Sequence, residues 1–132
     1  MKYMLDTNII AYIRNQQPEA VLRQFARYQP DDLCISVITL AELEYGVFRS
    51  SKPEYNRQAL MLLLSRIAII PFDEAAAREY GRIRDDLTRT GTLIGANDLL
   101  IAAHACSLGL TLITNNIREF ERVEGLRLEN WV

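Results

Sequence analysis

The spacing of apolar residues along this chain changes repeatedly between two patterns. Short apolar runs, typical of buried strands, alternate with longer stretches in which apolar residues recur at the three- and four-residue intervals of a helix face. The predicted strands cover residues 3–5, 33–36, 68–71, 111–114 and 126–128. The predicted helices cover residues 9–14 and 18–28, a segment ending at residue 48, and residues 55–66, 74–90, 97–107 and 118–122.

Strands and helices that alternate in this order predict an α/β fold. We expect a central, mostly parallel β-sheet of about five short strands with helices on both faces. Asp73 is suited to cap a helix at its start, as is Ser36 or Thr39, and Gly109 is suited to end one in the left-handed conformation. No linker or internal repeat divides the chain, so residues 1–132 are expected to form a single domain.

Composition places the chain among ordinary globular proteins, with 49% hydrophobic and 24% charged residues. No apolar run approaches the length of a membrane span, and the first residues lead straight into a predicted strand, so we expect a cytoplasmic protein. The two cysteines, Cys34 and Cys106, match no zinc or redox spacing and are expected to be reduced thiols in the core.

The net charge of -2 is lower than is usual for a protein that binds nucleic acid. One divalent cation held by acidic residues would bring that charge to 0, and two would bring it to +2. Most of the basic residues are arginines, which suit contacts with phosphate groups. Net charge therefore does not exclude a nucleic-acid substrate.

Three acidic residues lie within apolar segments that are otherwise typical of a protein core. Asp6 follows the first predicted strand, Glu42 lies inside an apolar helical run, and Asp98 opens an apolar helix. Carboxylates are rarely buried unless something offsets their charge. Ligands of open α/β sheets bind beyond the carboxyl ends of the strands, so we expect these acids to meet there, beside the segment Thr114–Asn116.

Such a cluster of carboxylates predicts a metal-dependent hydrolase. Mg²⁺ and Mn²⁺ prefer oxygen ligands, and a bound cation can activate water and stabilise charge as a phosphodiester is attacked. The alternative interpretation is that Asp6 and Asp98 cap helices and that Glu42 faces solvent. His104, the one histidine, has no partner for a zinc site and is expected to be a hydrogen-bonded residue at the edge of the core.

Four motifs carry a resemblance to a known family. They are Leu-Asp-Thr-Asn at 5–8, Thr-Leu-Ala-Glu-Leu-Glu-Tyr-Gly at 39–46, Ile-Gly-Ala-Asn-Asp-Leu-Leu-Ile-Ala at 94–102, and Leu-Ile-Thr-Asn-Asn-Ile-Arg-Glu-Phe at 112–120. Together they span the chain, which resembles the PIN-domain ribonucleases, specifically the VapC toxins of bacterial VapBC toxin–antitoxin pairs. The resemblance implies a PIN-like fold and an endoribonuclease.

The resemblance also implies roles for individual residues. Asp6, Glu42 and Asp98 are expected to coordinate Mg²⁺ or Mn²⁺ and to position the attacking water, with Asn8 and Thr114 supporting the site through hydrogen bonds.

The fourth acid of the site departs from the common pattern. Asn116 stands where many PIN domains carry an aspartate, and Glu119 resembles the acid that replaces it in the branch bearing Thr-Asn-Asn. The alternative for Glu119 is a solvated partner of Arg118 or Arg122.

VapC-like proteins are implied to be homodimers that a VapB antitoxin neutralises by lying in an apolar groove. Val37, Ile38, Val47 and Phe48, together with the run Leu60–Leu64, are candidates for that surface, although core packing explains them equally well.

The implied substrate is RNA. The branch that the chain most resembles cuts tRNA, notably initiator tRNA in the anticodon region, whereas other branches cut ribosomal RNA. The candidate RNA contacts are Arg14, Lys52, Arg84, Arg89 and Arg118.

Two other functions remain open from the sequence. One is a Mg²⁺-dependent phosphatase of the haloacid dehalogenase type, which requires a second acid where this chain has Asn8 and a lysine beyond Lys2 and Lys52. The other is a PIN-like scaffold that binds RNA or a partner without cutting, for which Asn116 is the only support.

Overall fold

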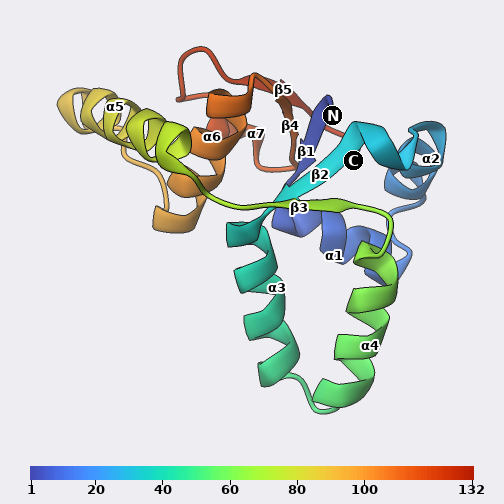
Figure 1. Ribbon diagram of the computed structural model, residues 1–132. Helices are drawn as coiled ribbons and strands as arrows, with labels where there is room; N and C mark the ends of the chain where they lie inside the picture. The colour runs from blue at the N-terminus through green and yellow to red at the C-terminus, as the bar shows by residue number, and fades with distance from the viewer.

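Five short strands form one parallel sheet in the computed structural model, which describes residues 1–132 (Figure 1). The strands are β1 (Tyr3–Leu5), β2 (Leu33–Ser36), β3 (Ala68–Ile70), β4 (Thr111–Ile113) and β5 (Arg127–Glu129). They lie in the order β3-β2-β1-β4-β5, and every neighbouring pair is parallel. The predicted α/β fold is confirmed, and the sheet is wholly parallel.

Seven α-helices connect the strands. They are α1 (Thr7–Asn15), α2 (Glu19–Arg27), α3 (Val37–Arg49), α4 (Pro53–Leu64), α5 (Glu74–Thr90), α6 (Ala96–Leu108) and α7 (Ile117–Phe120), with a 3₁₀ turn at Pro30–Asp32. Every predicted helix is present, with ends that shift by one or two residues. The largest shift is in α4, which begins at Pro53 because proline suits the first helical position. No helix is both long and apolar enough to cross a membrane.

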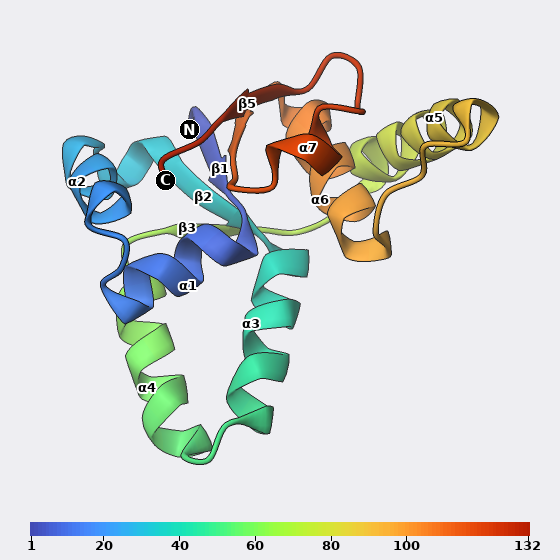
Figure 2. The same cartoon turned by 180° about the vertical axis from the view of Figure 1, so that it is seen from behind.

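The sheet separates two apolar cores because successive side chains of a strand point to opposite faces. Met4, Cys34 and Leu112 pack with α5 and α6 on one face. Leu5 and Ile113, from the same strands β1 and β4, pack with α1, α3 and α4 on the other. Both views show this division, with α3 and α4 projecting from the sheet as a hairpin (Figures 1 and 2).

Backbone caps decide where the site-bearing helices begin. Asp6 and Ser36 cap α1 and α3, each accepting a backbone N–H with its side-chain oxygen. Gly95 occupies the cap position of α6, so the alternative that Asp98 caps this helix is wrong. Asp98 lies within the first turn instead, and its carboxylate is free for other contacts.

Candidate active site

Asp6 lies at the floor of the site, where β1 passes into α1. Its side chain is only 3% exposed. One carboxylate oxygen accepts the backbone N–H of Thr7 at 2.8 Å, and the other accepts the hydroxyl of Thr114 at 2.8 Å. Burial raises the pKa of Asp6, and these two hydrogen bonds oppose that rise. The carboxylate is therefore held in one orientation.

The turn after β4 fixes Glu119 beside Asp6. Buried Thr114 follows the last residue of β4, and its hydroxyl oxygen accepts the N–H of Asn116 at 3.0 Å. The Asn116 amide donates to Glu119 Oε2 at 2.6 Å, and the N–H of Gly95 donates to Glu119 Oε1 at 2.6 Å. Glu119 is thus held by backbone and amide donors and pairs with neither Arg118 nor Arg122.

Asp98 is half-buried in the first turn of α6 and faces Glu119. Burial raises the pKa of Asp98 to about 7, helped by its hydrogen bond with Glu119 and by the charges of Asp6, Glu119 and Glu42. The pKa of Glu119 is lowered, chiefly by the N–H of Gly95. A proton shared by the two groups therefore lies on Asp98, which is about half protonated near pH 7.

Glu42 reaches the cluster from α3 and is held by two donors on other helices. The hydroxyl of Thr7, in α1, donates to Glu42 Oε1. The amide of Asn97, in α6, lies 3.4 Å from Glu42 Oε2 and donates to it. Glu42 is half-buried, and these contacts join the starts of α1 and α6 to α3. The alternative of a freely solvated Glu42 is wrong.

The structure thus brings together all four acids that the sequence singled out. Asn116 lies in the cluster as a donor to Glu119, whereas Asn8 is exposed and its side chain makes no hydrogen bond within the chain. Sequence reasoning missed three groups that hold the acids in place: Thr7, Gly95 and Asn97. The only signal for them was their position inside the Leu-Asp-Thr-Asn and Gly-Ala-Asn-Asp motifs.

Comparison with known proteins identifies the family. The model of the PIN domain family matches residues 3–126. The chain belongs to the PIN-domain family. Over its full length it is 47% identical to Ribonuclease VapC2 of Haemophilus influenzae, covering 99% of that protein. It is 46% identical over 131 residues to the tRNA(fMet)-specific endonuclease VapC of Shigella flexneri, with 99% of this chain and 98% of that protein aligned. It is therefore a member of the VapC ribonucleases within the family.

This PIN domain is similar in structure to chains of solved toxin–antitoxin complexes. The DNA-bound VapBC complex of Salmonella typhimurium contains a chain that matches with a TM-score of 0.95 and 42% identity, covering 100% of this chain and 99% of that one. A VapBC2 chain from Rickettsia felis, bound to a promoter DNA fragment, matches with a TM-score of 0.93 and 45% identity over 100% of both chains. The predicted PIN fold is confirmed.

The acid cluster of this PIN domain suits a hydrated divalent cation, and PIN-domain nucleases generally depend on divalent metal ions. No three acidic, histidine or cysteine side chains converge as a preformed metal cage. Mg²⁺ needs no such cage, because it usually keeps several of its waters and takes only a few carboxylates. Burial and the charges of the neighbouring acids raise the pKa of Asp98, and a divalent cation would offset the repulsion between those charges. The donor set therefore fits the ion.

Two of the five basic residues predicted to contact RNA are already engaged within α5. Arg84 donates to the hydroxyl of Tyr80 at 2.7 Å, and Arg89 forms an ion pair with Asp85. Arg14, at the end of α1, and Arg118, in α7, are exposed and belong to no ion pair. Arg118 is next to Glu119 along the chain and Arg14 belongs to the helix that Asp6 caps, so these two are the better-placed candidates.

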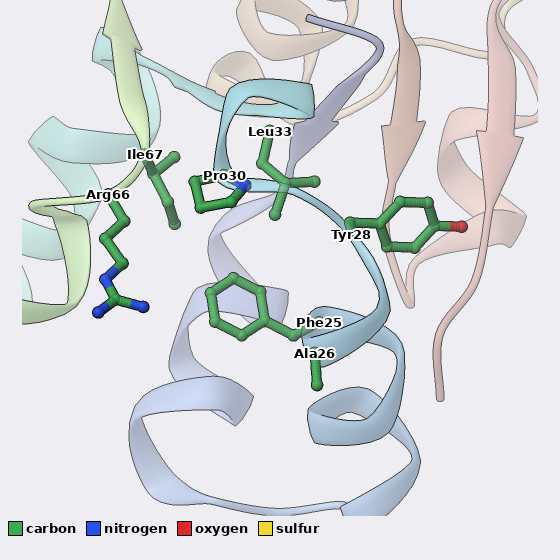
Figure 3. Close-up of a pocket in the computed structure, with 7 residues that line it drawn as sticks. All are labelled: Phe25, Ala26, Tyr28, Pro30, Leu33, Arg66 and Ile67. Carbon is green, nitrogen blue, oxygen red and sulfur yellow. The ribbon is translucent and has the colours of Figure 1, made fainter.

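An apolar cavity of about 300 Å³ lies away from the acids (Figure 3). Its lining residues are Phe25, Ala26, Tyr28, Pro30, Leu33, Arg66 and Ile67. Leu33 begins β2 and Ile67 precedes β3, so the cavity lies at the amino ends of these strands. The acids follow the carboxyl ends of β1 and β4, so this cavity is not part of the acid site.

Proposed function

We propose that this protein is the toxin of a VapBC-type toxin–antitoxin pair and cuts tRNA as a Mg²⁺- or Mn²⁺-dependent endoribonuclease. The observation that carries the proposal is the meeting of Asp6, Glu42, Asp98 and Glu119, from four separate segments, at one edge of the sheet. Membership of the VapC ribonucleases supports it independently. The match to that family leaves no support for a phosphatase.

In the proposed mechanism, Asp6, Glu42 and Asp98 hold the cation. A bound Mg²⁺ or Mn²⁺ would supply a water of lowered pKa and positive charge facing the scissile phosphate. Asp6 keeps its orientation because Thr7 and Thr114 hold both of its oxygens. Asp98 would hold the cation as a carboxylate, so binding would release to solvent the proton that Asp98 carries below about pH 7.

Glu119 is proposed as the fourth acid of the mechanism. Its pKa is lowered, so it remains ionised at neutral pH and is suited to orient a water next to the cation. Asn116 is proposed to support it, because the Asn116 amide fixes one of the two Glu119 oxygens.

We propose a tRNA substrate from the printed name of one of the relatives. The Shigella flexneri relative, 46% identical, is named a tRNA(fMet)-specific endonuclease, which supports initiator tRNA as the substrate. We propose that the cut lies in the anticodon region of this tRNA. Single-stranded loops offer unpaired bases that side chains can reach, unlike the deep major groove of an RNA duplex. A tRNA substrate places this activity in the cytoplasm.

The proposed partners are a VapB-like antitoxin and a second copy of the chain. Of the residues that the sequence suggested for the antitoxin-binding surface, some are exposed and others are buried. Val47, Leu60 and Leu64 lie in the core, which corrects their assignment to a surface. Large side chains remain exposed on the α3–α4 hairpin, and we name them the hairpin patch: Tyr45, Phe48, Tyr55, Met61 and Leu62. Exposed apolar patches of this kind mark protein interfaces, and VapBC complexes among the solved relatives support one here.

The test is cleavage of total bacterial RNA by the purified, antitoxin-free protein, with Mg²⁺ or with a chelator, followed by sequencing of the cut ends. One dominant, metal-dependent cut in tRNA is expected. Asp98→Asn should lose it, while Asp31→Asn, which changes an exposed acid outside the cluster, should keep it. If the folded protein cuts no RNA with Mg²⁺ or with Mn²⁺, this proposal is replaced by that of a scaffold that binds RNA without cutting it.

A further inference from the structure

A buried hydrogen bond joins α6 to the start of α3. His104 Nδ1 lies 2.7 Å from Ser36 Oγ, and the two residues are 1% and 0% exposed. The Ser36 oxygen also accepts the N–H of Ile38 at 3.0 Å, which caps α3. His104 is thus fully inside the protein, deeper than the core edge expected from the sequence.

The surroundings of the His104 ring indicate which atom, Nδ1 of His104 or Oγ of Ser36, accepts the hydrogen bond between them. The ring also donates to the backbone carbonyl of Pro71 and meets Phe72 edge-on at 5.3 Å. Burial lowers the pKa of His104, so the ring is neutral. A neutral imidazole with its proton facing Pro71 leaves Nδ1 as the acceptor of the Ser36 hydroxyl. Because neither residue is accessible to a substrate, this serine–histidine pair is not a nucleophile and its base.

The two joined helices are those that carry Glu42 and Asp98. Ser36 precedes Glu42 by six residues along α3, and His104 follows Asp98 by six residues along α6. Each acid therefore lies about 9 Å along its helix from the buried bond, at 1.5 Å per residue. The Asn97–Glu42 contact joins the same helices at the site, so both acids lie on the same side of the buried bond.

We propose that His104 is a positioning residue for the acid site: by holding Ser36 it fixes α3 against α6, and thereby Glu42 relative to Asp98. The expected effect on metal binding rests on the proposed function. The expected effect on the relative position of the two helices does not. Two helices joined only at the solvent-exposed Asn97–Glu42 contact could slide or rotate. The buried bond removes that freedom. If the helices moved apart, its donor and acceptor would lose each other, and no water could take the place of either partner.

The test compares His104→Leu, His104→Asn and Ser36→Ala with Leu64→Ala. The leucine at 104 has no acceptor, whereas an asparagine oxygen can occupy the position of Nδ1 and accept from Ser36. Leu64→Ala opens a cavity in the core that α3 and α4 share on the other face of the sheet, and so controls for lost packing and stability while the buried bond remains. If His104→Leu does not fold, Ser36→Ala and His104→Asn supply the comparison.

The first measurement is Mn²⁺ affinity, by calorimetry well below each Tm. His104→Leu and Ser36→Ala are expected to weaken binding about tenfold, the usual cost of losing a residue that orients metal ligands. His104→Asn should bind within about threefold of the natural protein. Leu64→Ala should bind normally despite a lower Tm. Normal binding by His104→Leu, or an equal loss in Leu64→Ala, would overturn the proposal.

The second measurement uses the metal-free protein and ¹H–¹⁵N NMR. The amide signals of Glu42 and Asn97 should move in His104→Leu, return toward their natural positions in His104→Asn, and stay in place in Leu64→Ala. Unmoved signals in His104→Leu would overturn the positioning role whether or not the protein binds Mn²⁺. Absence of Mn²⁺ binding by the natural protein would overturn the proposed function alone.

Discussion

Asp6 and Asp98 carry the same chemical group in different surroundings. Asp6 is almost wholly buried, yet two donors compensate its charge. Asp98 is more exposed, but burial, its hydrogen bond with another acid, Glu119, and the charges of the nearby acids together raise its pKa to about 7. Exposure alone would have ranked these residues in the opposite order. Burial raises the pKa of both carboxylates, and their hydrogen-bond partners, two donors for Asp6 and an acid for Asp98, set the two pKa values apart.

Removing the Asp98 carboxylate should separate activity from stability. Asp98→Asn is expected to lower RNA cleavage about a hundredfold or more, since even residues that only orient metal ligands contribute 10–100-fold. In the metal-free protein the same change should raise Tm at alkaline pH, because it removes one of several crowded charges. Cleavage assays and thermal melts check both effects. A variant that cuts RNA normally would exclude Asp98 from the site.

The raised pKa of Asp98 predicts how stability depends on pH. The folded protein binds its proton up to about pH 7, whereas the unfolded chain releases it near the ordinary value of 3.8. The folded state therefore holds more protons between these values, so this group's contribution to the free energy of unfolding falls as pH rises through that window. Denaturant titrations of the metal-free protein, at several pH values, measure the slope. The slope should flatten in Asp98→Asn, and one that persisted there would assign it to another group.

At the scale of elements, three helices, α1, α5 and α6, end with a residue in the left-handed conformation, and α1 and α5 differ in which residue stands there. Gly91 follows α5 with φ of 68°, and Gln16 follows α1 with φ of 59°. Glycine adopts this conformation without penalty, whereas a residue with a Cβ is disfavoured by about 1–2 kcal/mol. The chain therefore uses the favourable residue at one helix end and a less favourable one at the other.

These two helix ends give a matched pair of substitutions. Gly91→Ala should reduce the free energy of unfolding by about 1 kcal/mol, through backbone strain alone, because a Cβ there meets no atom within 4 Å. Gln16→Gly should increase it by up to about 1 kcal/mol. Denaturant unfolding measures both. Equal and like-signed effects at the two positions would contradict the backbone explanation.

At the scale of the whole molecule, the α3–α4 hairpin projects from the sheet (Figure 1), and it carries the exposed side chains of the hairpin patch. Phe48 is 71% exposed and Leu62 is 77% exposed. The guanidinium of Arg57 lies 4.6 Å from the centre of the Phe48 ring, and it pairs with Glu44. Arg57 thus joins the two helices while the apolar side chains remain uncovered.

The hairpin patch should control association and leave the fold intact. The double change Phe48→Ser and Leu62→Ser is expected to shift stability by no more than about 0.5 kcal/mol, because both side chains are exposed. It should weaken self-association and co-purification with the antitoxin. Light scattering and pull-down measure these, with Leu108→Ser, an exposed leucine at the end of α6, as the control. Association as strong as that of the natural protein would move the interface elsewhere.

The sequence by itself determined the order and type of the elements, because helix and strand periods, caps and turns act between near neighbours. Asp73 and Gly109 mark helix ends for that reason, and both predictions are confirmed. The sequence also singled out Asp6, Glu42 and Asp98, because a carboxylate inside apolar sequence needs compensation wherever the chain folds. The family motifs added Glu119.

Only the tertiary structure decided how those acids are held. Thr7 and Glu42 are 35 positions apart, Gly95 and Glu119 are 24 apart, and Ser36 and His104 are 68 apart. Packing likewise divided the run Leu60–Leu64 into buried and exposed residues. The high pKa of Asp98 has the same origin. Hydrogen bonds, charge repulsion and burial depend on distance in space, and distance along the chain does not specify them.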